Sequence, residues 1–338
     1  MAFKKFKDTN IGYSYDMTLL VTEIEQRQTA QGDPYCAVTL SDGEDSARCN
    51  MFNGITLDAL KDEGIEPGTC VDCSIRVSLY KDKKNYTIDS LKKADITDEQ
   101  MKELIITPPV PVKTLFYIIL KNIKESSGRT YDVNTPEVPD DDFSLTALAT
   151  RLLWKNRNAF LKSSAAKSMH HNLYGGLVYH TSRMTDAAMG LCNAYPDLDR
   201  ELVVCGTALH DIGKITELAT SATGSADYTV DGRLLGHALI GIDMIRAQVE
   251  EDGNRYNEEQ VRLLKHMIAS HHGVLEWGAI TEPAIKEAML LHFIDMIDSR
   301  MYMYETAYES VEPGQISQKI FGLAGDTSSS IYRSPYLK

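Results

Sequence analysis

Polar and apolar residues alternate through much of the first 95 positions, which is the pattern of β-strands with one buried face. Five strands are predicted, over 16–28, 35–40, 47–52, 70–80 and 85–89. The run Ser-Asp-Gly-Glu over 41–44 has the composition of a hairpin turn, and a short helix is predicted over 56–62. Three strands, a helix and two strands follow the order of a five-stranded β-barrel of the OB type.

From 144 to about 308, apolar residues recur at three- and four-residue spacing, which predicts helices throughout. The preceding stretch carries several prolines, helix candidates over 98–105 and 112–123, and an acidic loop over 130–142. We therefore predict a two-domain α+β protein. Its predicted parts are an N-terminal OB-type barrel over 1–95, a helical and proline-containing linker over 96–143, an all-α helical bundle over 144–315 and a C-terminal tail over 316–338.

The chain has 338 residues, of which 43% are hydrophobic, and this is enough for two separate cores. No run of about 18 apolar residues occurs, so no membrane span is predicted. The first residues include lysines but no apolar stretch behind them, so we expect no secretory signal and a cytoplasmic location. The net charge of −13 disfavours strong non-specific binding of nucleic acid, although a local basic groove is compatible with an acidic exterior.

Six cysteines are present, and we expect them to be reduced thiols. Cys70 and Cys73 form a lone C-x-x-C pair within a predicted strand. A zinc knot needs a second pair of ligands nearby, so this pair is interpreted as ordinary buried thiols.

All nine histidines follow position 169, and several fall at or near predicted helix ends. Seven residues in this region are candidate metal ligands: His180, His210, Asp211, His237, His271, His272 and Asp295. A helical bundle can direct such side chains into one central cavity. Imidazole and carboxylate ligands suit manganese, iron, cobalt, nickel or zinc. Each residue alone is weak evidence, but their order and spacing together predict a metal site.

Asp211 has two carboxylate oxygens, so it is predicted to bridge two divalent ions and to be essential for catalysis. Lys214 is a second candidate catalytic residue, because its ammonium could contact a phosphate oxygen; the alternative is a lysine that stabilises a helix end. Asp295 is preferred as the last ligand over Asp298, which would then support the site from one helical turn away. His170 and His171 are candidates for the substrate entrance.

The run His210-Asp211-Ile-Gly-Lys214, with His180 before it and Asp295 after it, resembles the signature of HD-domain phosphohydrolases. His237 and the later His-His-Gly run resemble the two-metal branch of that superfamily. The resemblance implies two ligand sets that share one carboxylate. One set would be His180, His210, Asp211 and Asp295, and the other Asp211, His237, His271 and His272.

A barrel followed by such a domain, which opens with Gly-Gly-Leu-Val-Tyr-His-Thr over 175–181, is similar to the YhaM-type 3′-5′ exoribonucleases of Gram-positive bacteria. The resemblance implies that the barrel feeds single-stranded RNA or DNA to the metal site. It also implies hydrolysis favoured by manganese or cobalt, with release of nucleoside monophosphates. No Gly-Tyr-Pro follows the His-Asp pair, which disfavours the branch that acts on cyclic dinucleotides.

OB barrels hold single strands by stacking bases on aromatic rings and by placing cations beside phosphates. Six residues of the predicted barrel are candidates for this role: Tyr35, Arg48, Phe52, Tyr80, Lys84 and Tyr86. The alternative is that Phe52 closes the barrel core and that the lysines occupy a solvated turn.

The sequence therefore predicts a metal-dependent 3′-5′ exonuclease acting on single-stranded RNA through a two-metal site. Two divalent transition-metal ions are expected, with manganese favoured and cobalt, iron, nickel or zinc tolerated. One alternative is a phosphohydrolase of small or cyclic nucleotides with a regulatory barrel, and another is a binding protein without activity. The choice between RNA and DNA and the question of a homo-oligomer stay open.

Overall fold

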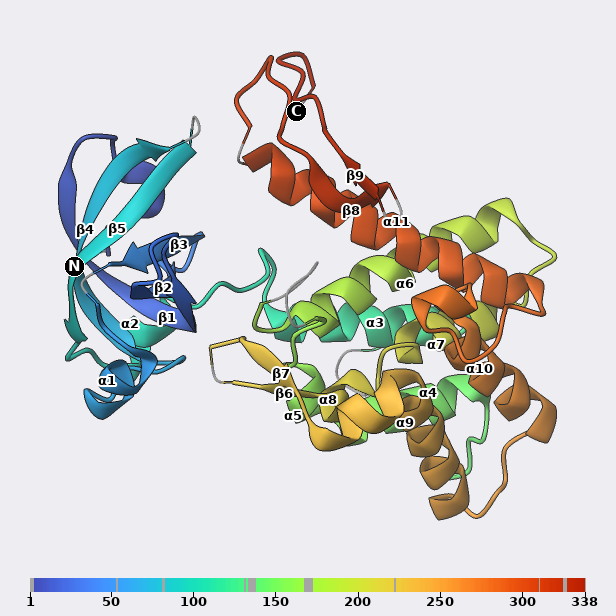
Figure 1. Cartoon of the computed structure of the whole chain (residues 1–338). Coiled ribbons are helices and arrows are strands. Elements are labelled where there is room, and N and C mark those ends of the chain that lie inside the picture. The colour runs from blue at the N-terminus through green and yellow to red at the C-terminus, as the bar shows by residue number, and fades with distance from the viewer. Residues whose placement is uncertain are drawn as a thin grey trace. The chain divides into compact units, whose positions relative to one another are not determined.

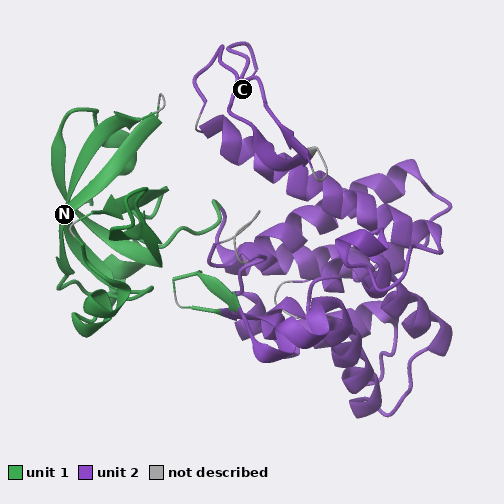
Figure 2. Ribbon diagram, in the orientation of Figure 1, with its two compact units in different colours: residues 1–109, 220–227 green, residues 110–219, 228–338 purple. Residues whose placement is uncertain are grey.

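The structure, a computed structural model, describes residues 3–52, 54–80, 83–130, 132, 138–166, 173–221, 223–309, 311–324 and 327–337. The chain divides into two compact units (Figure 2). The first contains residues 1–109 with 220–227, and the second contains 110–219 with 228–338. The predicted linker is thus shared between the two units, because its first part lies with the barrel and the rest lies with the helices.

The first unit is a closed five-stranded barrel, as predicted (Figure 1). Its strands are β1 (Ser14–Gln28), β2 (Pro34–Ser41), β3 (Ser46–Met51), β4 (Cys70–Tyr80) and β5 (Lys83–Lys93). They follow the order β1-β2-β3-β5-β4, and the antiparallel pairing of β1 with β4 closes the barrel. Helix α1 (Leu57–Asp62) lies between β3 and β4 in the chain, and the short elements η1 (Phe6–Asp8) and α2 (Asp98–Lys102) flank the barrel. This is the OB-type arrangement.

The barrel interior is built from alternate strand residues, because successive side chains of a strand point to opposite faces. In β2, for example, Cys36, Val38 and Leu40 are fully buried in one cluster. The two cysteines of the C-x-x-C pair are three positions apart on β4, so they enter different clusters. Burial raises the pKa of Cys70 to about 11 and that of Cys73 to about 12, so both are inert thiols.

The second unit is helical and has one large core (Figure 1). Its helices are α3 (Val112–Ser126), α4 (Leu145–Lys155), α5 (Arg157–Phe160), α6 (Gly176–Ala194), α7 (Arg200–Leu209), α8 (Lys214–Glu217), α9 (Val230–Glu251), α10 (Glu258–Ser270) and α11 (Lys286–Glu309), and η2 (Leu275–Trp277) is a single 3₁₀ turn. Helix α7 is buried along its length from Leu202 to Leu209. The end of α7 therefore delivers the residues that follow it into the interior.

Two hairpins depart from the sequence prediction. The expectation of helices throughout 144–308 was wrong at β6 (Leu218–Thr220) and β7 (Ala226–Tyr228), which pair with each other. Ser and Thr hydroxyls and the left-handed Gly224, with φ of 90°, form the turn between them. Strands of three residues are too short to give a readable alternation. In the tail, β8 (Ile320–Ala324) and β9 (Thr327–Ser329) form a second hairpin.

No helix in the described part of the chain combines the length and the apolar composition that crossing a bilayer requires.

Candidate metal centre

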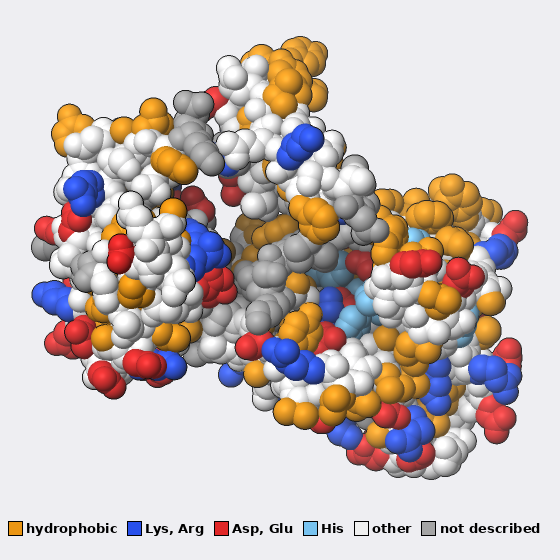
Figure 3. All heavy atoms as spheres, viewed as in Figure 1, with side chains coloured by type: hydrophobic (Ala, Val, Ile, Leu, Met, Phe, Trp, Pro, Cys, Tyr) orange, Lys and Arg blue, Asp and Glu red, His pale blue; other side chains and the backbone are white. Residues whose placement is uncertain are grey.

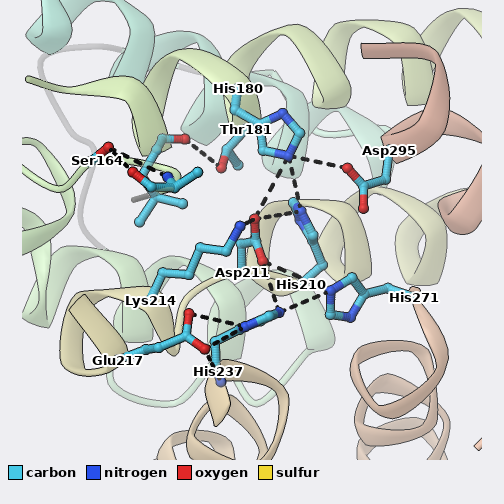
Figure 4. A network of polar contacts seen from close by, with 12 residues as sticks. Ser164, His180, Thr181, His210, Asp211, Lys214, Glu217, His237, His271 and Asp295 are labelled. Atoms are coloured by element: carbon cyan, nitrogen blue, oxygen red, sulfur yellow. Dashed lines mark hydrogen bonds and ion pairs between the residues drawn. The ribbon is translucent and has the colours of Figure 1, made fainter. Parts of the chain in front are cut away.

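Helices that are distant in the sequence bring their polar residues to one place in the helical unit (Figure 4). His180 lies in the second turn of α6, and Asp295 lies in the middle of α11. His210 caps the C-terminus of α7, and His271 caps that of α10. From outside, histidine side chains are visible at the bottom of a hollow in the surface of the helical unit (Figure 3). The centre is therefore deep but reachable.

Asp211 lies at the middle of this arrangement, and its two oxygens face different imidazoles. Its Oδ2 is 3.2 Å from Nε2 of His210 and 3.7 Å from Nε2 of His180. Its Oδ1 is 3.4 Å from Nε2 of His237 and 3.8 Å from Nε2 of His271. One carboxylate thus separates two pairs of nitrogen atoms.

The donor atoms fit divalent metal ions. Ligand atoms of His180, His210 and Asp211 lie within 4.8 Å of one another, and so do those of His237, His271 and His272. Two atoms bound to one ion at about 2.1 Å can be at most about 4.2 Å apart, so small shifts suffice. Oδ1 of Asp211 and Nδ1 of His272 are buried and have no hydrogen-bond partner among the residues that the structure describes. A buried carboxylate oxygen without a partner is costly, and a bound cation removes that cost.

Two of the imidazoles are oriented by the backbone. Nδ1 of His210 lies 2.8 Å from the carbonyl oxygen of Thr207, and Nδ1 of His271 lies 2.7 Å from that of Ile268. In each case the carbonyl is three residues earlier, in the last turn of the helix that the histidine caps. A carbonyl can only accept, so Nδ1 carries the proton and Nε2 turns a lone pair toward Asp211.

His180 is oriented by a carboxylate instead. Its Nδ1 is 2.7 Å from Oδ2 of Asp298, and the other oxygen of that carboxylate, Oδ1, accepts a hydrogen bond from Arg183. Its Nε2 is 3.4 Å from Oδ1 of Asp295. The two aspartates therefore lie against opposite nitrogens of the ring. Asp295 lies on the inward nitrogen, where a ligand belongs, and Asp298 supports the ring from behind.

The pKa values of the histidines are shifted in opposite directions in the two parts of the centre, upward for His180 and downward for His271 and His272. Burial lowers the pKa of His180, but Asp295 and Asp298 outweigh it and raise this pKa to about 9. Burial and the neighbouring imidazoles lower the pKa values of His271 and His272, so both rings are neutral and each can offer a lone pair to a metal ion. Burial raises the pKa of Asp211, but the Lys214 ammonium, with its Nζ 2.7 Å from Oδ2, outweighs it and holds that pKa well below its usual range.

Comparison with known proteins agrees with this geometry. Residues 177–300 match the HD domain family. This part of the chain is therefore similar to HD domains. An HD domain implies divalent metal binding, and the whole set of seven candidate ligands falls within the matched residues. The chain is therefore a metal-dependent hydrolase with an HD-type catalytic domain.

The likeness extends beyond the HD domain. The chain is 29% identical over 330 residues to the 3′-5′ exoribonuclease YhaM of Bacillus subtilis (strain 168), which covers 97% of each chain. Among solved structures, the mitochondrial single-stranded DNA binding protein Rim1 from S. cerevisiae matches 26% of this chain over its own full length. Its identity is 12% and its TM-score is 0.21, values that support no conclusion about this chain.

The HD domain brings the predicted ligands together, and it also contains a residue that sequence reasoning missed. The rings of His271 and His272 are 4.1 Å apart by their centroids, so the last predicted histidine joins the group. Glu217, at the end of α8, contacts His237 and was not predicted. Only its position three residues after Lys214 could have pointed to it. His170 and His171 lie outside the described residues.

The barrel candidates divide into two sets. The rings of Tyr35 and Phe52 pack with centroids 4.9 Å apart, and Phe52 is 53% exposed, so this pair can present a ring to a base. Arg48, on the neighbouring strand, forms an ion pair with Glu25, and Tyr80 is exposed.

Two of the barrel candidates have structural partners. Tyr86 is buried and packs edge-on against Phe6, so the prediction that it stacks on bases was wrong. Tyr86 faces inward because it shares the inward face of β5 with Ile88. Lys84 donates to the carbonyl oxygen of Thr9 at 2.6 Å, so its ammonium is occupied by the barrel itself.

Proposed function

We propose that this protein is a 3′-5′ exonuclease that hydrolyses single-stranded RNA to nucleoside monophosphates with two divalent ions, manganese being favoured. The observation that carries the proposal is the position of Asp211, whose two oxygens face separate pairs of imidazoles. A shared carboxylate is what a pair of ions needs when both act on one phosphate. The relative that covers 97% of the chain is a 3′-5′ exoribonuclease by name, which supports RNA as the substrate.

The proposed ligand sets follow from the contacts. One ion would be held by His180, His210, Asp295 and Oδ2 of Asp211, and the other by His237, His271, His272 and Oδ1 of Asp211. Ions bound there supply Lewis acidity and lower the pKa of water, so no protein nucleophile is required. The chain's own residues hold the carboxylate and the imidazoles in place and keep bulk water away from most of them, because these groups are largely buried.

Lys214 has two proposed tasks. Its Nζ donates to Oδ2 of Asp211 at 2.7 Å, which fixes the orientation of the shared carboxylate. An ammonium has three N–H donors, so others remain for a phosphate oxygen of the substrate. This places a positive charge where negative charge grows during attack on phosphorus.

The barrel is proposed to hold the single strand. Tyr35 and Phe52 form the ring pair for base stacking, and Arg48 and Tyr80 extend the exposed polar and aromatic surface of the same barrel. Stacking is tolerant of sequence, since every base has an aromatic face. Binding of this kind suits a 3′-5′ exonuclease that acts without sequence preference.

The full chain tests the proposal directly. Protein stripped of metal and then loaded with manganese should shorten a 5′-labelled single-stranded RNA from its 3′ end and release mononucleotides. Single-stranded DNA of the same sequence and a cyclic nucleotide serve as parallel substrates. Turnover of the cyclic nucleotide with the RNA left intact would replace the exonuclease with a small-nucleotide phosphodiesterase.

A further inference from the structure

We propose that Glu217 is a positioning residue that fixes the proton and the orientation of His237 and thereby sets the affinity of one of the two metal ions. The inference rests on the proposed two-metal function and adds to it a residue from outside the ligand sets. The carboxylate of Glu217 contacts both the ring and the backbone of His237. Its two oxygens lie 3.0 and 3.1 Å from Nδ1, and Oε1 also accepts a hydrogen bond from the backbone N–H at 3.0 Å.

The helical backbone of α9 is interrupted at Gly236, immediately before His237, and this interruption allows His237 to contact Glu217. Gly236 has φ of 71° and ψ of 155°, a conformation that lies outside the helical region and that favours glycine. The break removes the N–H of His237 from the helical hydrogen-bond ladder, and Glu217 takes it instead. Glu217 thus lies at the start of the second part of α9, where a negative charge is favourable.

Glu217 is itself held firmly. Its backbone carbonyl accepts from the N–H of Thr229 at 2.9 Å. The backbone of Gly232 approaches so closely that a Cβ atom there would be 2.2 Å from the carbonyl oxygen of Glu217. The residue as a whole is only 7% exposed. A buried carboxylate with so few ways to move is suited to hold a ring in one orientation.

The consequence for His237 is a defined tautomer. Nδ1 carries the proton and donates a hydrogen bond to the carboxylate, so Nε2 keeps its lone pair. That nitrogen lies 3.4 Å from Oδ1 of Asp211 and 3.3 Å from Nε2 of His271, inside the second ligand set. His180 has the matching arrangement, with Asp298 behind its Nδ1. Each ligand set therefore has one histidine backed by a carboxylate.

A purely structural role is the alternative, because Glu217 also caps a helical segment. The isosteric Glu217→Gln keeps an oxygen for the N–H of His237 but removes the charge behind Nδ1. Glu217→Ala removes both. Glu287→Gln is the matched control, since Glu287 is similarly buried, accepts a backbone N–H from Asp199, and lies outside both ligand sets.

The experiment measures metal binding rather than catalysis. Manganese is titrated into metal-free full-length protein, and bound metal is counted after desalting. We expect Glu217→Gln and Glu217→Ala to weaken one of two ions by roughly 10- to 100-fold, which is the usual effect of removing such a partner, and to leave the other ion near wild-type affinity. Asp298→Asn should weaken the other ion instead, and Glu287→Gln should weaken neither.

A second measurement is independent of bound metal. Nitrogen chemical shifts of His237 in the metal-free protein report which ring nitrogen carries the proton. We expect the proton on Nδ1 in the wild type and a mixture of tautomers in Glu217→Ala. The proposal would be overturned if both Glu217 variants bound the two ions with wild-type affinity and kept the wild-type tautomer of His237. It would also be overturned if the variants weakened the binding of both ions equally. Because neither readout uses RNA, a failure of RNA hydrolysis would count against the proposed function alone.

Discussion

Each unit of the molecule buries an aspartate, and the two are satisfied differently. Asp42 in the barrel is 0% exposed and Asp211 in the helical unit is 3% exposed. The Asp42 carboxylate accepts from the backbone N–H groups of Phe6 at 2.6 Å, Glu44 at 2.8 Å and Asp45 at 2.7 Å. Asp211 has Lys214 on Oδ2, while its Oδ1 lacks any hydrogen-bond partner among the described residues.

The contrast between the two aspartates indicates that the reactive groups of this chain lie in the helical unit. Burying a charge is costly unless hydrogen bonds or an opposite charge compensate for it. The barrel uses its buried carboxylate to hold a turn together, so nothing remains for a ligand. The helical unit leaves an oxygen uncompensated among imidazoles, and this is tolerable only where a cation can bind.

Substitutions of these two aspartates should have very different consequences. Asp211→Asn should lower hydrolysis of every phosphodiester substrate by at least roughly 10³-fold, because the amide has a single oxygen and no charge and cannot bridge the two proposed ions, and metal ions contribute several kcal/mol to the transition state. Asp42→Asn should instead cost about 1–3 kcal/mol of stability, since an amide satisfies fewer of the backbone donors, and leave the rate per folded molecule unchanged. Kinetics at equal folded concentration, with denaturant unfolding alongside, check both. Near-normal turnover in Asp211→Asn would end the bridging assignment.

Metal removal should affect the two units unequally. A ligand at a hundred times its Kd stabilises the native state by about 2.7 kcal/mol, so chelation should destabilise the helical unit by roughly that amount per ion. Hydrogen exchange read by peptide, with and without a chelator, checks this. Protection should fall around α7, α9 and α10 and stay constant in β1 to β5. An equal loss of protection in the barrel would show that the ions stabilise both units and not the helical unit alone.

The contrast between the helical unit and the barrel also explains which features could be predicted from the sequence. The candidate ligands of the helical unit could be predicted because metal chemistry restricts them to a few residue types, and these occur in a recognisable order along the chain. Glu217 was not readable, since its role depends on the break at Gly236 and on the packing against Gly232. In the barrel, five strands followed from alternation, but the face on which Tyr86 lies depends on the register of β5 with its neighbours.

A smaller effect is expected at the exposed ring of the barrel. Stacking on one aromatic ring contributes about 1–3 kcal/mol per base, so Phe52→Ala should raise KM for a long single-stranded RNA by roughly 5- to 100-fold. Turnover of a dinucleotide should be unaffected, because both of its nucleotides flank the bond that is cleaved and none is left for the barrel to hold. Tyr13→Ala is the control, since Tyr13 is another exposed aromatic residue of the barrel, at 64%. Equal effects of the two substitutions would indicate that the Tyr35–Phe52 pair has no special role.

The smallest expected effect concerns Lys84, the lysine that the sequence placed beside the phosphates. Its Nζ lies 2.6 Å from the carbonyl oxygen of Thr9 and 3.5 Å from that of Phe6, so it ties the N-terminal segment to β5. A charged hydrogen bond of this kind contributes about 1.5–3 kcal/mol. Lys84→Ala should therefore lower barrel stability by about that amount or less, given its exposure to solvent.

RNA binding distinguishes the two roles of Lys84 through its dependence on salt. A cation that pairs with a single-strand phosphate contributes about 0.7 to the slope of log K against log salt, because binding releases a counterion. We expect the slope for Lys84→Ala to equal that of the wild type, since a lysine already bound to backbone carbonyls contributes little to phosphate binding. A slope reduced by about 0.7 would mean that RNA displaces Thr9 from the ammonium. The barrel would then resemble the helical unit in using one side chain both for an internal contact and for the ligand.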